Sequence, residues 1–192
     1  DRYARAGLWG SKQRMGMGTR VTGKKLGILG LGRIGLAIAE RAQGFKMNIG
    51  YHNRKTVADV AHDYFDSVVA LAQWADCLIV ACPGGAATEH LVNAAVLQAL
   101  GEHGLLINIA RGSVVDEAAL LAALEASHIA GAALDVFERE PHIPSLLLQS
   151  EKVVLTPHIG SATRETRLDM DDLLLQNVAA FVQDGRLLTE VC

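Results

Sequence analysis

Aromatic residues are scarce in this chain, which has two Trp, three Tyr and four Phe among 192 residues. Proline is also rare, with four residues, whereas glycine occurs 19 times. Half of the residues are hydrophobic, so the chain can bury one core, although it is short for two complete lobes. Alanine, leucine and glycine in place of aromatic residues suit helices packed closely on a parallel sheet better than an all-β sandwich.

The sequence also lacks basic tracts and long apolar runs. Its formal net charge is -3, so nothing marks a surface for nucleic acid or for an anionic membrane. The apolar runs, such as residues 77–82, have the length of strands and fall far short of the ~20 residues that cross a bilayer. The chain opens at Asp1 without a methionine, and no secretory signal pattern follows, so we expect a cytoplasmic protein.

Cysteine and histidine show no spacing typical of a metal site. The cysteines are three, an odd number, and two of them flank an apolar run, which favours reduced structural thiols over disulfides or metal ligands. These residues are Cys77, Cys82 and Cys192. Six histidines are interpreted as surface or loop residues, namely His52, His62, His90, His103, His128 and His142. We therefore expect no metal.

From residue 24 onward, short apolar runs alternate with helical patterns, as in repeated βα units. This rhythm predicts an α/β fold in which helices cover both faces of a parallel sheet. Strands are expected at 25–29, 47–51, 77–81, 105–109, 131–136 and 153–156. Helices are expected at 34–43, 67–74, 93–100, 116–126 and 163–183, the last ending before Gly185. Residues 56–65 are ambiguous and are interpreted as a broken helix and a short strand.

A glycine triplet follows the first expected strand directly and opens the first helix. It reads Gly30-Leu31-Gly32-Arg33-Ile34-Gly35. In this context Gly30 permits a tight turn, Gly32 lets backbone N–H groups approach a pyrophosphate, and Gly35 lets the helix pack closely on the strand. The positive end of the helix faces the phosphates, and the loop residues Arg33 and Ile34 belong to the same cradle. The pattern predicts a bound dinucleotide.

The end of the second expected strand indicates which dinucleotide is preferred. It reads Tyr51-His52-Asn53-Arg54-Lys55-Thr56, without the carboxylate that normally holds the ribose hydroxyls of NAD. Arg54 offers a planar fork that can bind a 2′-phosphate, and Asn53, Lys55 and Thr56 are further donors. The sequence therefore favours NADP(H) over NAD(H). The alternative is that Arg54 and Lys55 form an ordinary solvated turn.

Three later segments each follow an expected strand and carry polar residues that packing alone does not explain. They are Asn108-Ile109-Ala110-Arg111-Gly112, Leu134-Asp135-Val136-Phe137-Glu138-Arg139-Glu140-Pro141 and Thr156-Pro157-His158-Ile159-Gly160-Ser161. In an open parallel sheet, loops beyond the carboxyl ends of the strands form the ligand crevice. We therefore expect Arg111, Glu140 and His158 to converge on one site, where the histidine could exchange a proton near neutral pH.

With these motifs in this order, residues 23–189 resemble the D-2-hydroxyacid dehydrogenase family, particularly its glyoxylate/hydroxypyruvate reductase-like members. The resemblance implies a Rossmann-type doubly wound sheet and hydride transfer between NADP(H) and a small 2-keto or 2-hydroxy acid. Arg111 is similar to the substrate-binding arginine, His158 to the proton donor and acceptor, and Glu140 to the acid paired with it. Glu138 is a rival for that last role, but the family pattern places the acid immediately before proline.

The resemblance further implies which residues line the cofactor site. Asp135 would contact the nicotinamide amide, and Arg111 and His158 would lie beside the nicotinamide. Other residues implied for the cofactor groove are Cys82, Pro83, Thr88, Ile109, Ala110 and Gly160.

Members of the family carry a smaller substrate domain ahead of the nucleotide-binding domain, and we expect it to be missing here. Residues 1–22 would then be the incoming connector, 23–162 the nucleotide-binding domain, and 163–192 a helix and tail that pack partly on the absent domain. The expected consequences are exposed apolar residues on the last helix (Leu168, Leu173, Leu174 and Phe181), cofactor binding with little turnover, and a homodimer through the nucleotide-binding domain. The alternative function is a nucleotide-sensing corepressor or scaffold on the same fold.

Overall fold

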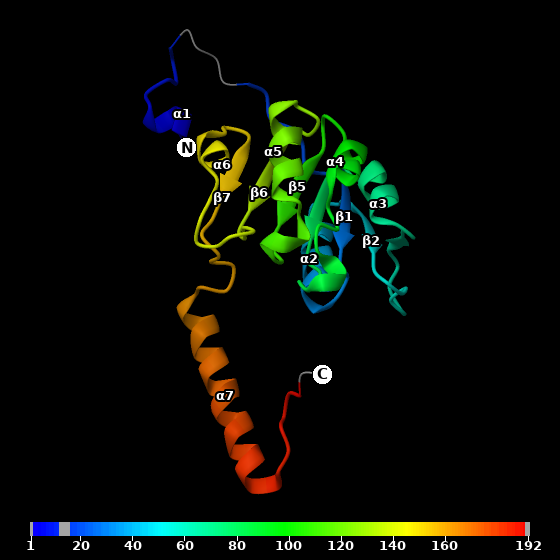
Figure 1. The fold of residues 1–192 in the computed structure, drawn as a ribbon, viewed down its shortest axis with the longest axis vertical. Coiled ribbons are helices and arrows are strands. Elements are labelled where there is room, and N and C mark those ends of the chain that lie inside the picture. The colour runs from blue at the N-terminus through cyan, green and yellow to red at the C-terminus, as the bar shows by residue number, and fades with distance from the viewer. Residues whose placement is uncertain (1, 12–15, 191–192) are drawn as a thin grey trace.

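The computed structural model describes residues 2–11 and 16–190, and its centre is a parallel sheet flanked by helices (Figure 1). The seven strands of that sheet run in the order β3-β2-β1-β4-β5-β6-β7. Their bounds are β1 Lys25–Leu29, β2 Asn48–His52, β3 Asp63–Tyr64, β4 Cys77–Val80, β5 Leu105–Asn108, β6 Gly131–Leu134 and β7 Val153–Leu155. All neighbouring strands pair in parallel, so their carboxyl ends meet at one edge.

The order of the strands reverses beside β1, because the chain first builds toward β3 and then returns to add β4 on the other side of β1. This is the arrangement of a doubly wound Rossmann-type fold, as the sequence predicts, and ligands bind such sheets at the reversal point. The helices are α1 Arg2–Arg5, α2 Arg33–Gln43, α3 Val68–Trp74, α4 Ala94–Leu100, α5 Glu117–Glu125, α6 Ser145–Gln149 and α7 Arg164–Asp184, with short 3₁₀ turns η1 Ala86–Thr88 and η2 Gly112–Val114.

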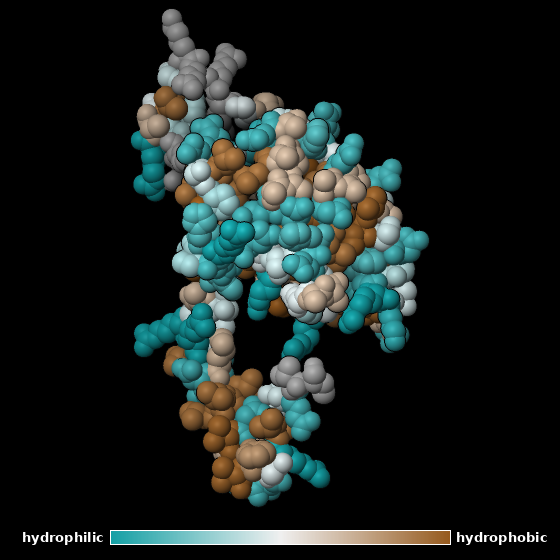
Figure 2. Space-filling model, viewed as in Figure 1, coloured by the Kyte–Doolittle hydropathy of each residue, from teal (hydrophilic) through white to brown (hydrophobic). Residues whose placement is uncertain are grey.

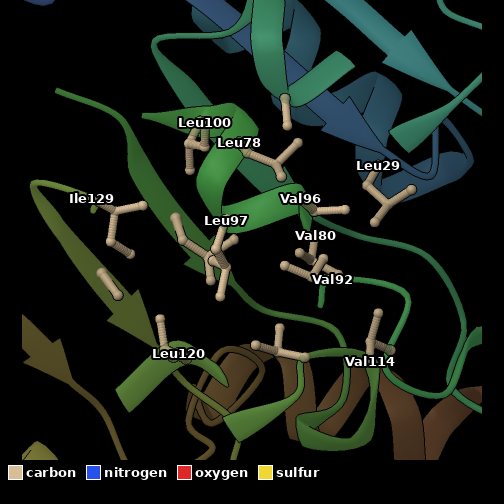
Figure 3. Close-up of a cluster of buried hydrophobic side chains, with 14 of the residues drawn as sticks. Leu29, Leu78, Val80, Val92, Val96, Leu97, Leu100, Val114, Leu120 and Ile129 are labelled. Atoms are coloured by element: carbon tan, nitrogen blue, oxygen red, sulfur yellow. The ribbon is translucent and has the colours of Figure 1, made fainter. Parts of the chain in front are cut away.

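Helices α3, α4 and α5 bury one face of the sheet, and α2 packs on the other. The larger hydrophobic cluster joins side chains of those three helices to alternate strand residues. Figure 3 shows part of it, with Leu29, Leu78, Val80, Val92, Val96, Leu97, Leu100, Val114, Leu120 and Ile129. The smaller cluster joins Ala39 and Ala42 of α2 to Ile28, Ile49 and Tyr51 of the strands. Because the central strands β1, β4 and β5 are largely buried, they read as apolar runs in the sequence.

Side-chain caps set the starts of four helices. The side chains of Ser67, Asn93, Asp116 and Thr163 accept hydrogen bonds from backbone N–H groups in the first turns of α3, α4, α5 and α7. Each of these residues was expected to be the first of its helix, and the helix in fact begins one residue later because the cap itself has extended backbone. At the other end of α7, Gly185 adopts a left-handed conformation with φ 66°, as its position after the helix predicts.

Part of the expected secondary structure was wrong. No helix forms within 56–65, where a turn with Asp59 at φ 58° precedes the short strand β3, which pairs with β2 as the expected short strand would. Helix α6 was not expected, and neither was α1 within the connector at 1–22. Cys77 and Cys82 are free thiols, and burial, with Asp76 nearby, raises the pKa of Cys77 to about 11, whereas Cys192 lies outside the described residues.

Helix α7 projects away from the sheet (Figure 1), and Figure 2 shows hydrophobic side chains gathered along it. The residues expected to be exposed there are exposed: Leu168 by 55%, Leu173 by 43%, Leu174 by 63% and Phe181 by 58%. Within residues 2–11 and 16–190, no helix combines the length and apolar character that a membrane span requires.

Candidate functional site

The glycine loop brings the end of β1 against the end of β4. Gly30 has φ 101°, and a Cβ there would lie 2.5 Å from the backbone nitrogen of Cys82. A Cβ on Gly35 would collide with the carbonyl oxygen of Gly30, so α2 rests directly on the turn. Both positions need glycine for the fold itself, because neither a left-handed backbone nor contact with another main chain leaves room for a side chain.

Gly32 differs from its neighbours because a Cβ there would meet nothing within 4 Å. It caps α2 without any side-chain hydrogen bond, so the N–H groups of the first turn have no partner within the helix. A helix start of this kind binds anions through its N–H groups and its dipole. The residues present therefore fit the pyrophosphate of a dinucleotide, which would take the space in front of Gly32.

The variant Gly32→Ala tests whether this glycine is needed for cofactor binding and not for the fold. We expect the melting temperature to stay within the range of a Gly18→Ala control, since neither added methyl group would have an atom of the described residues within 4 Å. We expect the dissociation constant for the dinucleotide to rise at least about tenfold, because the methyl group would lie where the phosphate approaches the backbone. Isothermal titration calorimetry of both variants measures this difference, and equal affinities would remove Gly32 from the cradle.

Asn53 supports the loop from β2. The Leu31 N–H donates to Asn53 Oδ1 at 2.7 Å, and Asn53 Nδ2 donates to the Leu31 carbonyl at 3.4 Å. Its amide is thus engaged with the glycine loop, which the sequence did not indicate. Arg54 and Lys55 are exposed beyond it, and their contact with a 2′-phosphate stays a prediction.

A cleft of about 830 Å³ lies at the carboxyl ends of the strands. The predicted residues Arg111, Glu140 and His158 all line it, although they come from the loops after β5, β6 and β7. Other predicted residues that line it are Ile34, Cys82, Pro83, Ile109 and Ala110. Residues that line it but were not predicted are Ala81, Gly84, Gly85, Gly112, Ser113, Phe137 and Glu138.

The remaining predicted residues lie off this lining. Thr88 donates its hydroxyl to the carbonyls of Pro83 and Gly85, at 2.8 and 3.1 Å, and so fixes the turn after β4. Asp135 and Gly160 contact each other in the loops after β6 and β7. The glycine loop, which includes Arg33, follows β1. Strand β2 is followed by Asn53, Arg54 and Lys55. The predicted residues therefore extend along the same edge of the sheet from β2 to β7.

His158 and Glu140 are in direct contact, with 2.7 Å between Nδ1 and Oε2. The other carboxylate oxygen of Glu140 accepts a hydrogen bond from the Phe137 N–H at 3.0 Å. The bond from His158 lowers the pKa of Glu140 most, burial opposes it, and the Phe137 amide and the charges of His158 and Arg111 lower it further. Glu140 is therefore ionised at neutral pH and holds the imidazole through Nδ1, whereas Nε2 has no hydrogen-bond partner among the described residues.

The backbone at His158 is left-handed, with φ 52°. Its N–H donates to the Asp135 carbonyl at 2.8 Å, which holds this conformation in place. Such backbone costs a non-glycine residue about 1 kcal/mol or more and persists where surrounding contacts demand it. The conformation turns the imidazole toward Glu140.

Asp135 organises the same loop through its carboxylate. Oδ1 accepts from the Thr156 hydroxyl at 2.6 Å and from the Ile159 N–H at 2.9 Å, and Oδ2 accepts from the Gly160 N–H at 2.9 Å. Burial acts to raise the pKa of Asp135, but these donors and the charge of His158 hold it below its usual range. The carboxylate thus anchors the histidine loop, a role that the sequence did not indicate; its contact with the nicotinamide stays a prediction.

Arg111 is positioned by two features of the chain around it. Asn108, 1% exposed, accepts from the Ala110 N–H at 3.0 Å and donates to the Arg111 carbonyl at 3.0 Å, which shapes the turn. The arginine side chain then crosses Gly84, where a Cβ would lie 2.6 Å from Arg111 Cγ. Asn108 was missed as a supporting residue, although an asparagine that ends an apolar strand was a signal for it.

Comparisons with known proteins show the family to which the chain is related. Residues 1–160 match the family model described as D-isomer specific 2-hydroxyacid dehydrogenase, NAD binding domain. The chain is 50% identical over 191 residues to a glyoxylate/hydroxypyruvate reductase A of Arabidopsis thaliana and 48% identical over 194 residues to a hydroxyphenylpyruvate reductase of Plectranthus scutellarioides. In both cases all of this chain is aligned with 61% of the relative.

Among solved structures, the chain is similar to an NADPH-dependent glyoxylate/hydroxypyruvate reductase from Sinorhizobium meliloti in complex with NADP and malonate. The TM-score is 0.94 and the sequence identity 45%, with 100% of this chain covering 60% of that one. The chain thus spans 60–61% of the length of these relatives. The matched family model, the identity to curated relatives and the shared fold together show that this chain belongs to the D-isomer specific 2-hydroxyacid dehydrogenase family, as its NAD-binding domain.

Proposed function

We propose that this protein is an oxidoreductase that transfers a hydride between NADP(H) and a small 2-keto or 2-hydroxy acid, as glyoxylate/hydroxypyruvate reductases do. The observation that carries the proposal is the cleft in which Arg111 lies with the Glu140–His158 pair, beside a glycine loop that fits a dinucleotide. The names of the relatives support the same substrate class.

Each of these side chains has a chemical task. Arg111 presents a planar fork suited to hold the carboxylate of a 2-keto acid by two charge-assisted hydrogen bonds. When bound, the nicotinamide cofactor supplies the hydride or accepts it. Reduction leaves negative charge on the former carbonyl oxygen, and His158 Nε2 delivers a proton there, because Nδ1 is engaged by Glu140. Ionised Glu140 fixes the tautomer of the imidazole and orients it before the transfer.

The preference for NADP(H) over NAD(H) rests on Arg54 and Lys55. Arg54→Ala removes the planar fork, and we expect the dissociation constant for NADPH to rise about 10- to 100-fold, the effect of losing charge-assisted hydrogen bonds worth ~1.5–3 kcal/mol. The affinity for NADH should change little. Fluorescence titration with both nucleotides measures the ratio, with Arg186→Ala, beyond the end of α7, as the matched control. Tighter binding of NADH than of NADPH by the wild type would contradict the preference.

The proposed reaction is tested by NADPH oxidation with glyoxylate, hydroxypyruvate and bulkier 2-keto acids, using the protein at its full encoded length. We expect turnover with at least one small 2-keto acid. A nucleotide-sensing scaffold would bind NADPH and oxidise none of it, and that result would overturn the proposal. Residues 1–192 alone should bind the cofactor but turn over slowly, because one wall of a cleft neither excludes water nor holds the substrate tightly.

Two broader properties belong to the same proposal. We expect a homodimer formed through the nucleotide-binding domain, as the resemblance implies, and a cytoplasmic location. Multi-angle light scattering of the purified chain decides the first, since a monomer at all concentrations would exclude it. Fractionation of the source cells decides the second.

A further inference from the structure

A second histidine–carboxylate pair lies next to the cleft. His90 Nε2 lies 2.6 Å from Glu138 Oε1, although the two residues are 48 positions apart in the sequence. His90 follows the η1 turn in the connection after β4, and Glu138 lies in the loop after β6 and lines the cleft. The proposed reaction gives neither residue a task, since the proton passes through His158 and the substrate carboxylate is held by Arg111.

Both members of the pair are also fixed through their backbones. The His90 N–H donates to the Ser113 carbonyl at 2.8 Å, two residues beyond Arg111. The Glu138 N–H lies 3.4 Å from Glu117 Oε2 at the start of α5. Between these points, Gly112 rests on the Phe137–Glu138 peptide so closely that a Cβ would collide with it. The pair therefore connects the loops that follow β4, β5 and β6.

Glu138 stands inside the turn that orients the Glu140 carboxylate. The Phe137 N–H, one residue before Glu138, donates to Glu140 Oε1, and Glu140 Oε2 contacts His158. A shift of Glu138 therefore moves the donor that fixes Glu140. The same shift alters the surface on which Gly112, the neighbour of Arg111, is packed.

The groups around His90 favour its charged form. The hydrogen bond to Glu138 is the main cause that raises the pKa of His90, partial desolvation opposes it, and the charges of Asp116, Glu138 and Glu89 add to it. Close to Glu117 lie Arg139 and His142. The contact is thus an ion pair while His90 is protonated, and it becomes a hydrogen bond from a neutral imidazole to a carboxylate as the pH rises through the raised pKa of His90.

We propose that His90 and Glu138 are positioning residues that clamp the loop after β6. The clamp keeps Glu140 in contact with His158 and keeps Arg111 in place to bind the substrate. Their effect on reduction rests on the proposed function, whereas the clamp itself can be measured without turnover. No chemical step passes through either residue.

The test uses His90→Gln in the 192-residue chain, because glutamine keeps a polar side chain but carries no charge. We expect the Glu140 carboxyl pKa, followed by carbon-detected NMR, to move up toward its ordinary value. We also expect the Phe137 amide to exchange its hydrogen several-fold faster, because the bond to Glu140 opens more often. Glu138→Gln should give the same two changes from the other side of the pair.

Two further variants separate a clamp from a general loss of structure. His103→Gln is the matched control, because His103 lies 3.6 Å from Glu102 on an open surface, 93% and 78% exposed, and should change neither readout. His90→Arg keeps a cation beside Glu138 and should restore both. The proposal would be overturned if His90→Gln and Glu138→Gln kept the wild-type pKa of Glu140 and the wild-type exchange rate of the Phe137 amide. It would also be overturned if His103→Gln changed both quantities equally, or if His90→Arg failed to restore them.

At full encoded length the same variants should lower kcat by about 10- to 100-fold, the order of effect of misplacing a reacting group by an ångström, with the cofactor affinity unchanged. Unchanged kcat in His90→Gln would overturn the positioning role. If the wild-type protein oxidises no NADPH with any 2-keto acid, the proposed function fails, and the NMR readouts still decide whether the clamp exists.

Discussion

His158→Gln is expected to lower kcat for reduction of the 2-keto acid by about 10²- to 10⁴-fold, the usual contribution of a positioned general acid. Glutamine has nearly the size of histidine and can still hydrogen-bond to Glu140, but it cannot release a proton near neutral pH. The cofactor affinity should fall far less than kcat, because the phosphate cradle lies in the glycine loop after β1, whereas His158 follows β7 and is expected beside the nicotinamide only. Steady-state kinetics at full encoded length, with calorimetric titration of NADPH, measure both quantities.

The control for this prediction is His128→Gln. His128 is exposed after α5 and lies outside the cleft, so the variant should keep the wild-type kcat. If His158→Gln retained more than half of the wild-type kcat while the folded structure was intact by circular dichroism, another group would have to donate the proton. That proton donor would then be another of the residues that line the cleft.

The sheet could be predicted because its signals are local. Parallel strands buried on both faces appear as uninterrupted apolar runs, and capping residues such as Ser67 and Asn93 mark where the next helix begins. Helix α6 was missed because it has five residues and follows Pro144, which gives it no side-chain cap. Within 56–65 the short strand was expected correctly and the broken helix was wrong, because the contacts of this segment are with β2, which is not adjacent in the sequence.

The convergence of Arg111, Glu140 and His158 could also be predicted. Each follows a strand, and once all strands are parallel their carboxyl ends must meet at one edge. The contacts that refine the site were not visible in the sequence, since they join residues far apart in the chain. Asn53 and Leu31 are 22 positions apart, and His90 and Glu138 are 48 apart. Nothing in the local pattern around these residues indicates the partner.

Gly112→Ala is the substitution from which we expect the largest loss of stability. A Cβ on Gly112 would collide with the carbonyl group of Phe137 and the nitrogen of Glu138, so the obstacle is main chain that no rotamer change can move aside. Overpacking of a core typically costs about 1–3 kcal/mol, and we expect the free energy of unfolding to fall by at least this amount. Urea denaturation of the 192-residue chain, followed by circular dichroism, measures the change.

The same substitution should also displace residues of the site. Gly112 is the neighbour of Arg111, and the displaced peptide belongs to the turn that orients Glu140. Even in the fraction of Gly112→Ala that stays folded, kcat should be reduced at full encoded length. Gly32→Ala is the matched control for stability, since its added methyl group meets no protein atom. An unfolding midpoint for Gly112→Ala equal to that of Gly32→Ala would mean that the loops after β5 and β6 can separate freely, and the rigid link between Arg111 and Glu140 would then have no physical basis.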